Sequence, residues 1–140
     1  MSAPLTLADA QAVIAAAAHR ADEVGQPVNI AVVDAGGNLI AHVRQDEAWI
    51  GSIDISINKA WTARAFNTST SELGANSQPA QQFFGIHTTN SGRVTIFAGG
   101  LPLTRDDVVV GGIGVSGGSG EEDQSIAEAG AAALSARSFV

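Results

Sequence analysis

The sequence predicts an α/β fold, more narrowly α+β, with a mainly antiparallel sheet flanked by helices in a single domain spanning residues 1–140. Three observations indicate this fold. Long segments repeat apolar residues at helical spacing, and β-rich runs are joined by short connections that favour antiparallel pairing. Runs such as IAVV and VVV lack polar alternation and therefore suit a sheet covered on at least one face.

The N-terminal half is predicted to contain a helix, a hairpin and two further helices. Residues 7–24 carry an amphipathic pattern that begins at a Thr6 cap and ends at Gly25. VNIAVVDAGGNLIAHVR contains two β-rich runs around the turn residues D-A-G-G-N. SIDISINKAWTARAF alternates isoleucines like a strand, but its length and Ala-rich end favour a helix. Ser69 and Glu72 offer a capping box for a short helix after it.

The C-terminal half is predicted to contain a loop, two strands and a helix. QPAQQFFGIHTTNSG is predicted to be a loop with one further turn. RVTIFAG and VVVGGIGVS are predicted strands, and LPLTRDD is predicted to link them. The final helix is expected from Glu121 to Ser135.

Composition argues against several classes of protein. The net charge is −7 and the seven basic residues are scattered, so we expect no nucleic-acid partner. No stretch approaches the length of a membrane span, so we expect no membrane partner either. The absence of cysteine excludes disulfides and thiolate chemistry. The start MSAPLTLADAQ lacks the pattern of a signal peptide, which favours a cytoplasmic location.

Gly112, Gly114 and Gly117 fall on the spacing G-x-G-x-x-G, which in dinucleotide-binding folds marks a phosphate loop. Only 23 residues follow Gly117, too few for a second parallel strand and an acidic ribose ligand. The acidic run after the motif, EED, would also repel a phosphate at the helix N-terminus. We therefore expect these glycines to admit a closely packed helix or partner backbone. The amides of Gly117 to Gly120, including Gly118, could also form a small anion-binding nest.

Four blocks of the sequence, in order, resemble the GlcG and HbpS-like family of small bacterial proteins: VDAGGNLIAHVRQD, KAWTARAF, AGGLPL and GIGVSGGSGEEDQSIAEAG. That family also supplies the C-terminal domain of some PduO-type corrinoid adenosyltransferases. The resemblance covers nearly the whole chain, and SQPAQQFFGIHTTN departs from it most. It implies a profilin-like sandwich, homo-oligomeric assembly and haem binding, with oxidative haem degradation in some members.

Two cationic residues are candidates for binding an anionic ligand. Arg44, with Asp46 beside it on the same strand face, suits a carboxylate such as a haem propionate, because a guanidinium matches that geometry. The alternative is an Arg and Asp pair at a strand end. Lys59 lies on a predicted polar seam with Ser52, Ser56 and Thr62, from which it would bind an anion or act at a reaction centre. The alternative is a solvated or salt-bridged lysine.

Gly99 and Gly100, followed by Pro102, form a second candidate ligand contact. Their backbone amides would reach a ligand, or the segment would simply turn the chain between paired strands. Trp49 and Trp61 are expected in the core or an interface, and one of them could stack on a porphyrin. No residue is predicted to be catalytic.

The iron ligand, if haem binds, must come from a short set of side chains. The chain has no cysteine or tyrosine and its methionine is Met1, so the choice falls on the three histidines. His87 lies in the segment that departs most from the family, and His42 lies mid-strand beneath an expected helix. The resemblance suggests a ligating histidine in the first helix, which here is His19. The alternative is that His19 is a solvated side chain beside Arg20 and Asp22.

These observations leave three functional hypotheses. The first is a small cytoplasmic haem-binding protein with haem as cofactor, which the resemblance extends to haem degradation. The second is an enzyme or accessory protein of a catabolic pathway that acts on a small organic acid, with Arg44 and Lys59 holding the carboxylate. The third is a homo-oligomeric scaffold with no ligand of its own.

Overall fold

The computed structural model describes residues 3–137, and its centre is one antiparallel sheet. The strand order is β2–β1–β4–β3. The strands are β1 (Asn29–Asp34), β2 (Leu39–Arg44), β3 (Gly100–Arg105) and β4 (Val108–Ser116). An antiparallel sheet flanked by helices confirms the predicted fold class, and the hairpin around D-A-G-G-N is confirmed as β1 and β2.

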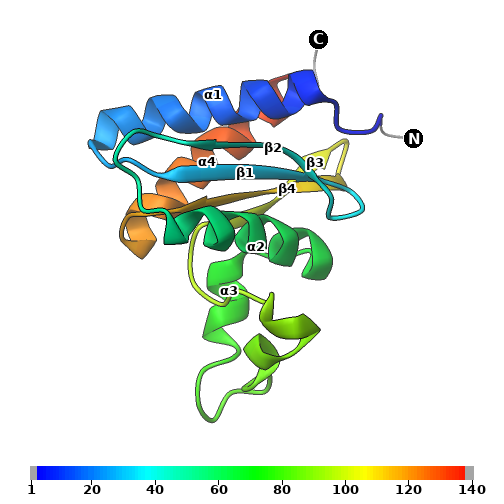
Figure 1. Ribbon diagram of the computed structural model, residues 1–140. Coiled ribbons are helices and arrows are strands. Elements are labelled where there is room, and N and C mark those ends of the chain that lie inside the picture. The colour runs from blue at the N-terminus through cyan, green and yellow to red at the C-terminus, as the bar shows by residue number, and fades with distance from the viewer. Residues whose placement is uncertain (1–2, 138–140) are drawn as a thin grey trace.

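The helices form a layer on each face of this sheet (Figure 1). α1 (Leu7–Val24) and α4 (Gly120–Arg137) cover one face, and α2 (Gly51–Phe66) covers the other. α3 (Thr70–Ala75) extends away from the sheet beyond α2, and two short 3-10 turns, Ile86–Thr88 and Asn90–Gly92, follow it. None of the helices within residues 3–137 is long and apolar enough to cross a membrane.

The main hydrophobic core lies between the sheet and the α1–α4 layer, whereas the α2 side is thinner. Ile30 and Val32 of β1 belong to the larger cluster with α1 and α4 residues. Ala31 and Val33, which alternate with them, contact Ala60 of α2 in a much smaller cluster. Small side chains on this second face bring α2 close to the strands.

Helix α1 begins and ends as predicted. At the N-terminus, the Thr6 hydroxyl accepts a hydrogen bond from the Asp9 amide, and the Asp9 carboxylate accepts one from the Thr6 amide. At the C-terminus, Gly25 ends the helix in the left-handed conformation at φ 74°. Asp9 also binds Arg105 at 2.8 Å and Arg137 at 3.1 Å. One buried carboxylate therefore ties α1 to the β3–β4 hairpin and to the end of α4.

The third strand is not where the sequence analysis placed it. The predicted strand Arg93–Gly99 is irregular, and the predicted linker LPLTRDD instead supplies β3 and a tight turn. Asp106 and Asp107 both have positive φ, 53° and 63°, as a two-residue hairpin turn requires. Pro102 is compatible with this strand because β3 lies at the edge of the sheet. The β-propensity of Arg93–Gly99 therefore placed the strand too early, and the segment directly before the Asp106–Asp107 turn forms β3.

The glycines of β4 allow α2 to approach the sheet. A Cβ at Gly114 would overlap the Ser56 carbonyl of α2, and a Cβ at Gly112 would overlap the Ala60 carbonyl. This confirms the expectation that a packed helix requires these glycines. Gly99 and Gly100, by contrast, do not turn the chain between paired strands, since the β3–β4 turn is at Asp106 and Asp107.

We predict that Gly114→Ala destabilises the fold by about 1–3 kcal/mol, because the added methyl group must displace the α2 backbone. Gly120→Ala is the matched control, since its Cβ would meet only the Ala98 side chain at an ordinary 3.6 Å. Urea denaturation of both variants measures the difference. Equal stability of the two variants would show that α2 yields freely.

A second prediction concerns acid stability. Burial alone would raise the pKa of Asp9, but hydrogen bonds from Arg105, Thr6 and Arg137 outweigh it and hold the pKa well below its usual range. The resulting stability is present above the unfolded-state pKa of about 3.9 and is lost as the pH falls below it. Asp9→Asn should therefore unfold about 1–3 kcal/mol more easily at pH 7, with a smaller difference from the parent at pH 3. Asp54→Asn, at an exposed carboxylate, is the control.

Candidate functional site

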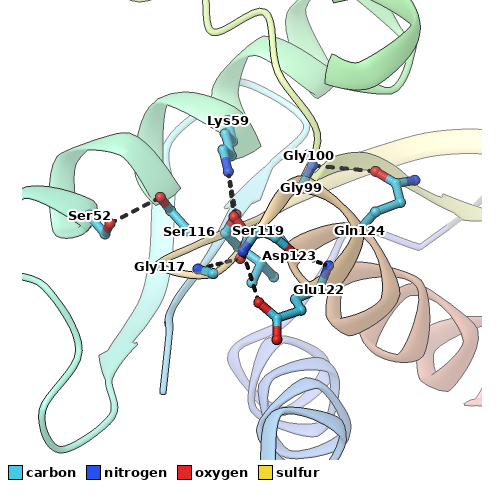
Figure 2. A network of polar contacts seen from close by, with 12 residues as sticks. Ser52, Lys59, Gly99, Gly100, Ser116, Gly117, Ser119, Glu122, Asp123 and Gln124 are labelled. Atoms are coloured by element: carbon cyan, nitrogen blue, oxygen red, sulfur yellow. Dashed lines mark hydrogen bonds and ion pairs between the residues drawn. The ribbon is translucent and has the colours of Figure 1, made fainter. Parts of the chain in front are cut away.

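The most unusual polar feature of the molecule is a completely buried lysine. Lys59 is 0% exposed and projects from α2 toward the first turn of α4 (Figure 2). Its Nζ donates to the Val115 carbonyl at 2.7 Å and to Asp123 Oδ2 at 3.1 Å. The Phe97 ring lies 4.9 Å from Nζ and contributes a cation–π contact. Lys59 therefore has partners on three sides within the protein.

Asp123, the counter-ion, is held by the glycine-rich loop before α4. Its Oδ1 accepts the Gly118 amide at 2.9 Å, and Glu122 Oε1 accepts the Ser119 amide at 2.9 Å (Figure 2). The predicted nest therefore exists in part, but the chain's own carboxylates occupy it. An external anion would have to displace them.

Burial acts against the charged form of both partners. It lowers the pKa of Lys59, and the Asp123 charge opposes that change. It likewise raises the pKa of Asp123, and Lys59 together with the Gly118 amide opposes that change. Removing two charges from water is costly, so the pair is stable only because its remaining hydrogen-bonding positions are also satisfied.

Glycines of the AGGLPL segment and of the loop before α4 pack around this pair. A Cβ on Gly99, which has φ 123°, would lie 2.8 Å from Lys59 Nζ and overlap the Val115 carbonyl. Gly100 donates its amide to Thr70 Oγ1 at 2.8 Å, and a side chain there would strike Thr70. The structure thus brings together five of the predicted ligand-binding residues: Lys59, Gly99, Gly100, Gly117 and Gly118. They pack around Asp123 and against one another, which leaves no space for an external ligand among them. With Asp123 only 3% exposed, the lysine is reached from within the fold and not from solvent.

The predicted polar seam on α2 is confirmed. Ser52, Ser56, Lys59 and Thr62 are all buried on its inner face. Ser52 and Ser116 share a hydrogen bond between their hydroxyls at 3.1 Å, which continues the seam onto β4. On the outer side of α2, the Asn58 side-chain amide donates to Asp54 Oδ2 at 2.9 Å.

Arg44 and Asp46 lie in a different place, around an open pocket of about 570 Å³ at the end of β2. The Arg44 guanidinium donates to the Ala48 carbonyl at 3.1 Å. Asp22, Asp46 and Glu47 line the same pocket, so Arg44 shares it with three carboxylates, none of them within 4.0 Å of the guanidinium. Arg44 and Lys59 share no contact, and a single small acid held by both does not fit this arrangement.

The three histidines occupy three environments. The His19 side chain is 77% exposed on α1, with Nε2 3.7 Å from Glu23 Oε2. His42 lies on β2 with Nε2 buried and no hydrogen-bond partner within residues 3–137, and burial lowers its pKa. His87 is exposed beside the Phe84 ring, 6.2 Å away. Residues 3–137 contain no cluster of three or more His, Asp or Glu side chains that could hold a metal ion.

Sequence reasoning missed Asp123, Thr70 and Phe97 as parts of the lysine cluster. Asp123 was interpreted only as a charge in the first turn of the last helix. A signal was available: the single lysine of the chain lies on a seam that faces the sheet, so it needs a carboxylate partner. The identity of that partner depends on contacts 64 residues apart, which spacing does not reveal.

The chain is a small α/β protein in which helices on opposite faces of an antiparallel sheet are joined by a buried ion pair. The chain belongs to the HbpS-like family, since the family model described as haem degrading protein HbpS-like matches residues 5–132. This confirms the resemblance found in the sequence.

Several relatives share most of the chain. A 15.0 kDa protein encoded in the dhaT-dhaS intergenic region of Citrobacter freundii is 42% identical over 126 residues, covering 90% of this chain and 89% of that protein. The corrinoid adenosyltransferase PduO of Citrobacter freundii is 41% identical over 87% of this chain, which corresponds to 36% of PduO. Protein GlcG of Escherichia coli is 34% identical over 76% of this chain and 77% of GlcG.

Solved structures agree with this grouping. The Klebsiella pneumoniae protein ORFY has a TM-score of 0.92 at 41% identity and covers 96% of this chain and 93% of its own. A PduOC:heme complex has a TM-score of 0.89 at 37% identity and covers 94% and 95%. HbpS has a TM-score of 0.83 at 37% identity and covers 94% and 91%.

We predict strong coupling between Lys59 and Asp123. Lys59→Met should lower the free energy of unfolding by about 3–5 kcal/mol, because the Asp123 carboxylate is left buried without its counter-ion. The double variant Lys59→Met/Asp123→Leu should lose less than the sum of the two single variants. Urea denaturation of the four proteins measures the coupling, and additive losses would show that the pair is not a unit.

Proposed function

We propose that this protein binds haem, with His19 on α1 as the iron ligand. The observation that carries the proposal is an exposed imidazole on a helix surface in a chain of the HbpS-like family. The haem complex of PduOC, similar along 94% of this chain, supports it. Bound haem would supply a redox-active iron, and the protein's own residues would hold and cover it.

The donor set fits a histidine-ligated haem. Without cysteine or tyrosine, imidazole is the available strong ligand for ferric iron. His42 Nε2 is enclosed by the fold and would have to be uncovered before it met a porphyrin. His19 needs no such opening, because its side chain already faces outward.

On its N-terminal side, His19 has only small neighbours along the helix. Helical side chains lean toward the N-terminus, so His19 lies over the preceding turn, where the neighbouring residues Ala12, Ala15 and Ala16 present only methyl groups. A flat ligand can therefore approach the imidazole closely. Glu23, at 3.7 Å, is near enough to orient the ring.

A haem on one helix face would remain half in water, so we propose that a second protomer covers it. The homo-oligomer and the cytoplasmic location expected from the sequence belong to this proposal, as does haem degradation. A role of Arg44 with a propionate is the least favoured part, because three carboxylates line its pocket.

We predict that haemin mixed with the parent protein shows a displaced Soret band and that His19→Ala loses it. His87→Ala is the matched control, since His87 is also exposed but comes from another segment. His42→Ala tests the buried alternative. A Soret band in His19→Ala identical to that of the parent would contradict the assignment, and its loss only in His42→Ala would move the ligand to the sheet.

A further inference from the structure

The distribution of ion pairs identifies a cationic site that the haem proposal does not use. Of the seven basic residues, Arg20, Lys59, Arg105 and Arg137 have a carboxylate partner. Within residues 3–137, Arg44, Arg64 and Arg93 have no carboxylate within 4.0 Å. Arg93 lies over the ring of Trp61 on α2, and Arg64 lines a pocket together with Trp61. Two arginines without a carboxylate partner therefore lie beside the same tryptophan, in a protein of net charge −7.

Two hydrogen bonds hold the Arg64 guanidinium in place, and some of its N–H donors stay without an acceptor among residues 3–137. Its Nε donates to the Ala35 carbonyl at 2.6 Å and its Nη1 donates to Asn67 Oδ1 at 2.8 Å. Its Nη2 has no acceptor within the part of the chain that the structure describes. Because two bonds fix the guanidinium plane, the free donors point in a defined direction with little further loss of entropy.

Arg64 forms one wall of a pocket between α2 and the β1–β2 turn. The pocket measures about 190 Å³ and is lined by Ala35, Gly36, Gly37, Trp61, Arg64 and Ala65. Since each liquid water occupies about 30 Å³, the space suits a molecule of a few heavy atoms. The pocket combines a cation with an indole and two methyl groups.

Trp61 is fixed against the turn and offers another donor. A Cβ on Gly37 would lie 2.8 Å from Trp61 Cδ1, so the glycine is what lets the indole lie there. Trp61 Nε1 makes no hydrogen bond within residues 3–137. The nearest carboxylate along the chain, Asp34, is engaged by the Gly36 and Asn38 amides at 2.9 Å. Asp34 itself does not line the pocket, and the side chains that do line it include two with N–H donors, Trp61 and Arg64, and none with a carboxylate.

Arg93 supports the indole from its ring face and does not line the pocket. Its Cζ lies 3.9 Å from the Trp61 ring centroid. Its backbone is tied to α2, since Thr62 Oγ1 donates to the Arg93 carbonyl at 3.3 Å and accepts the Thr95 amide at 3.1 Å. Arg93 is thus a positioning residue that also adds a second positive charge nearby.

We propose that the pocket of Trp61 and Arg64 binds a small carboxylate with a short aliphatic chain. Arg64 Nη2 and Trp61 Nε1 would donate to the carboxylate oxygens, and the indole with Ala35 and Ala65 would contact the chain. This site lies beyond the proposed haem function and replaces Arg44 and Lys59 as the place where an organic acid would bind.

The test follows the indole N–H resonance of Trp61 in haem-free protein at constant ionic strength. Trp49→Phe leaves Trp61 as the sole tryptophan, so one indole peak reports on this site alone. Acetate and propionate should shift it saturably, with propionate about fourfold tighter because it buries one more methylene group. Acetamide and propionamide, which are neutral and similar in shape, should leave it in place.

Variants of the Trp49→Phe protein assign the cation. Arg64→Gln should weaken propionate binding roughly tenfold or more, the loss of one charge-assisted hydrogen bond. Arg93→Gln should weaken it about two- to threefold through lost charge. Arg20→Gln, which removes the same charge from α1, should bind like the parent. No saturable shift, equal shifts with the amides, or equal affinity for acetate, propionate and inorganic phosphate would overturn the proposal.

Discussion

The ion pair between Lys59 and Asp123 is the constraint on which the rest of the structure depends. Lys59 comes from α2 and Asp123 from α4, helices that lie on opposite faces of the sheet, so the pair joins the two layers at the end of β4 (Figures 1 and 2). A buried pair is stable only if its remaining donors and acceptors are satisfied. The Val115 carbonyl and the Gly118 amide meet that need, and the absence of a side chain at Gly99 makes room for Nζ.

The same constraint decides where ligands can bind. The glycine-rich loop before α4 has the spacing of a phosphate loop, but Asp123 and Glu122 already accept its amides. Carboxylates within the chain have an effective concentration that a free anion cannot match, so the loop is a structural element. Both sites that we propose for ligands therefore lie on the outer surface, with His19 on α1 and with Trp61 and Arg64 on α2.

Local sequence patterns predicted most helices and strands, whereas the position of β3 and the partner of Lys59 depend on long-range contacts. Helix α1 has its cap at Thr6 and its stop at Gly25, both encoded within a few residues. The segment Arg93–Gly99 has β-branched and aromatic residues, yet the edge of β4 is taken by Gly100–Arg105, because the Asp106 and Asp107 turn sets the register. The polar seam on α2 was visible from helical spacing, whereas its partner Asp123 was not, since helical spacing says nothing about a contact between two helices separated by a sheet.

The two proposed sites lie on opposite layers of one tightly packed fold. His19 is on α1, Arg64 is on α2, and the sheet lies between them. Coupling between two sites requires an element with two arrangements that both ligands bias. The contacts that join the layers are tightly packed. Gly112 and Gly114 place the β4 backbone against the α2 backbone, and a Cβ at Gly130 of α4 would overlap the Ile113 side chain and lie only 3.2 Å from Val13. A core packed this closely transmits strain but offers little room for a second arrangement. Haem on α1 and a carboxylate on α2 should therefore bind with independent free energies in one protomer, and any dependence between them would have to arise where a neighbouring subunit contacts both surfaces.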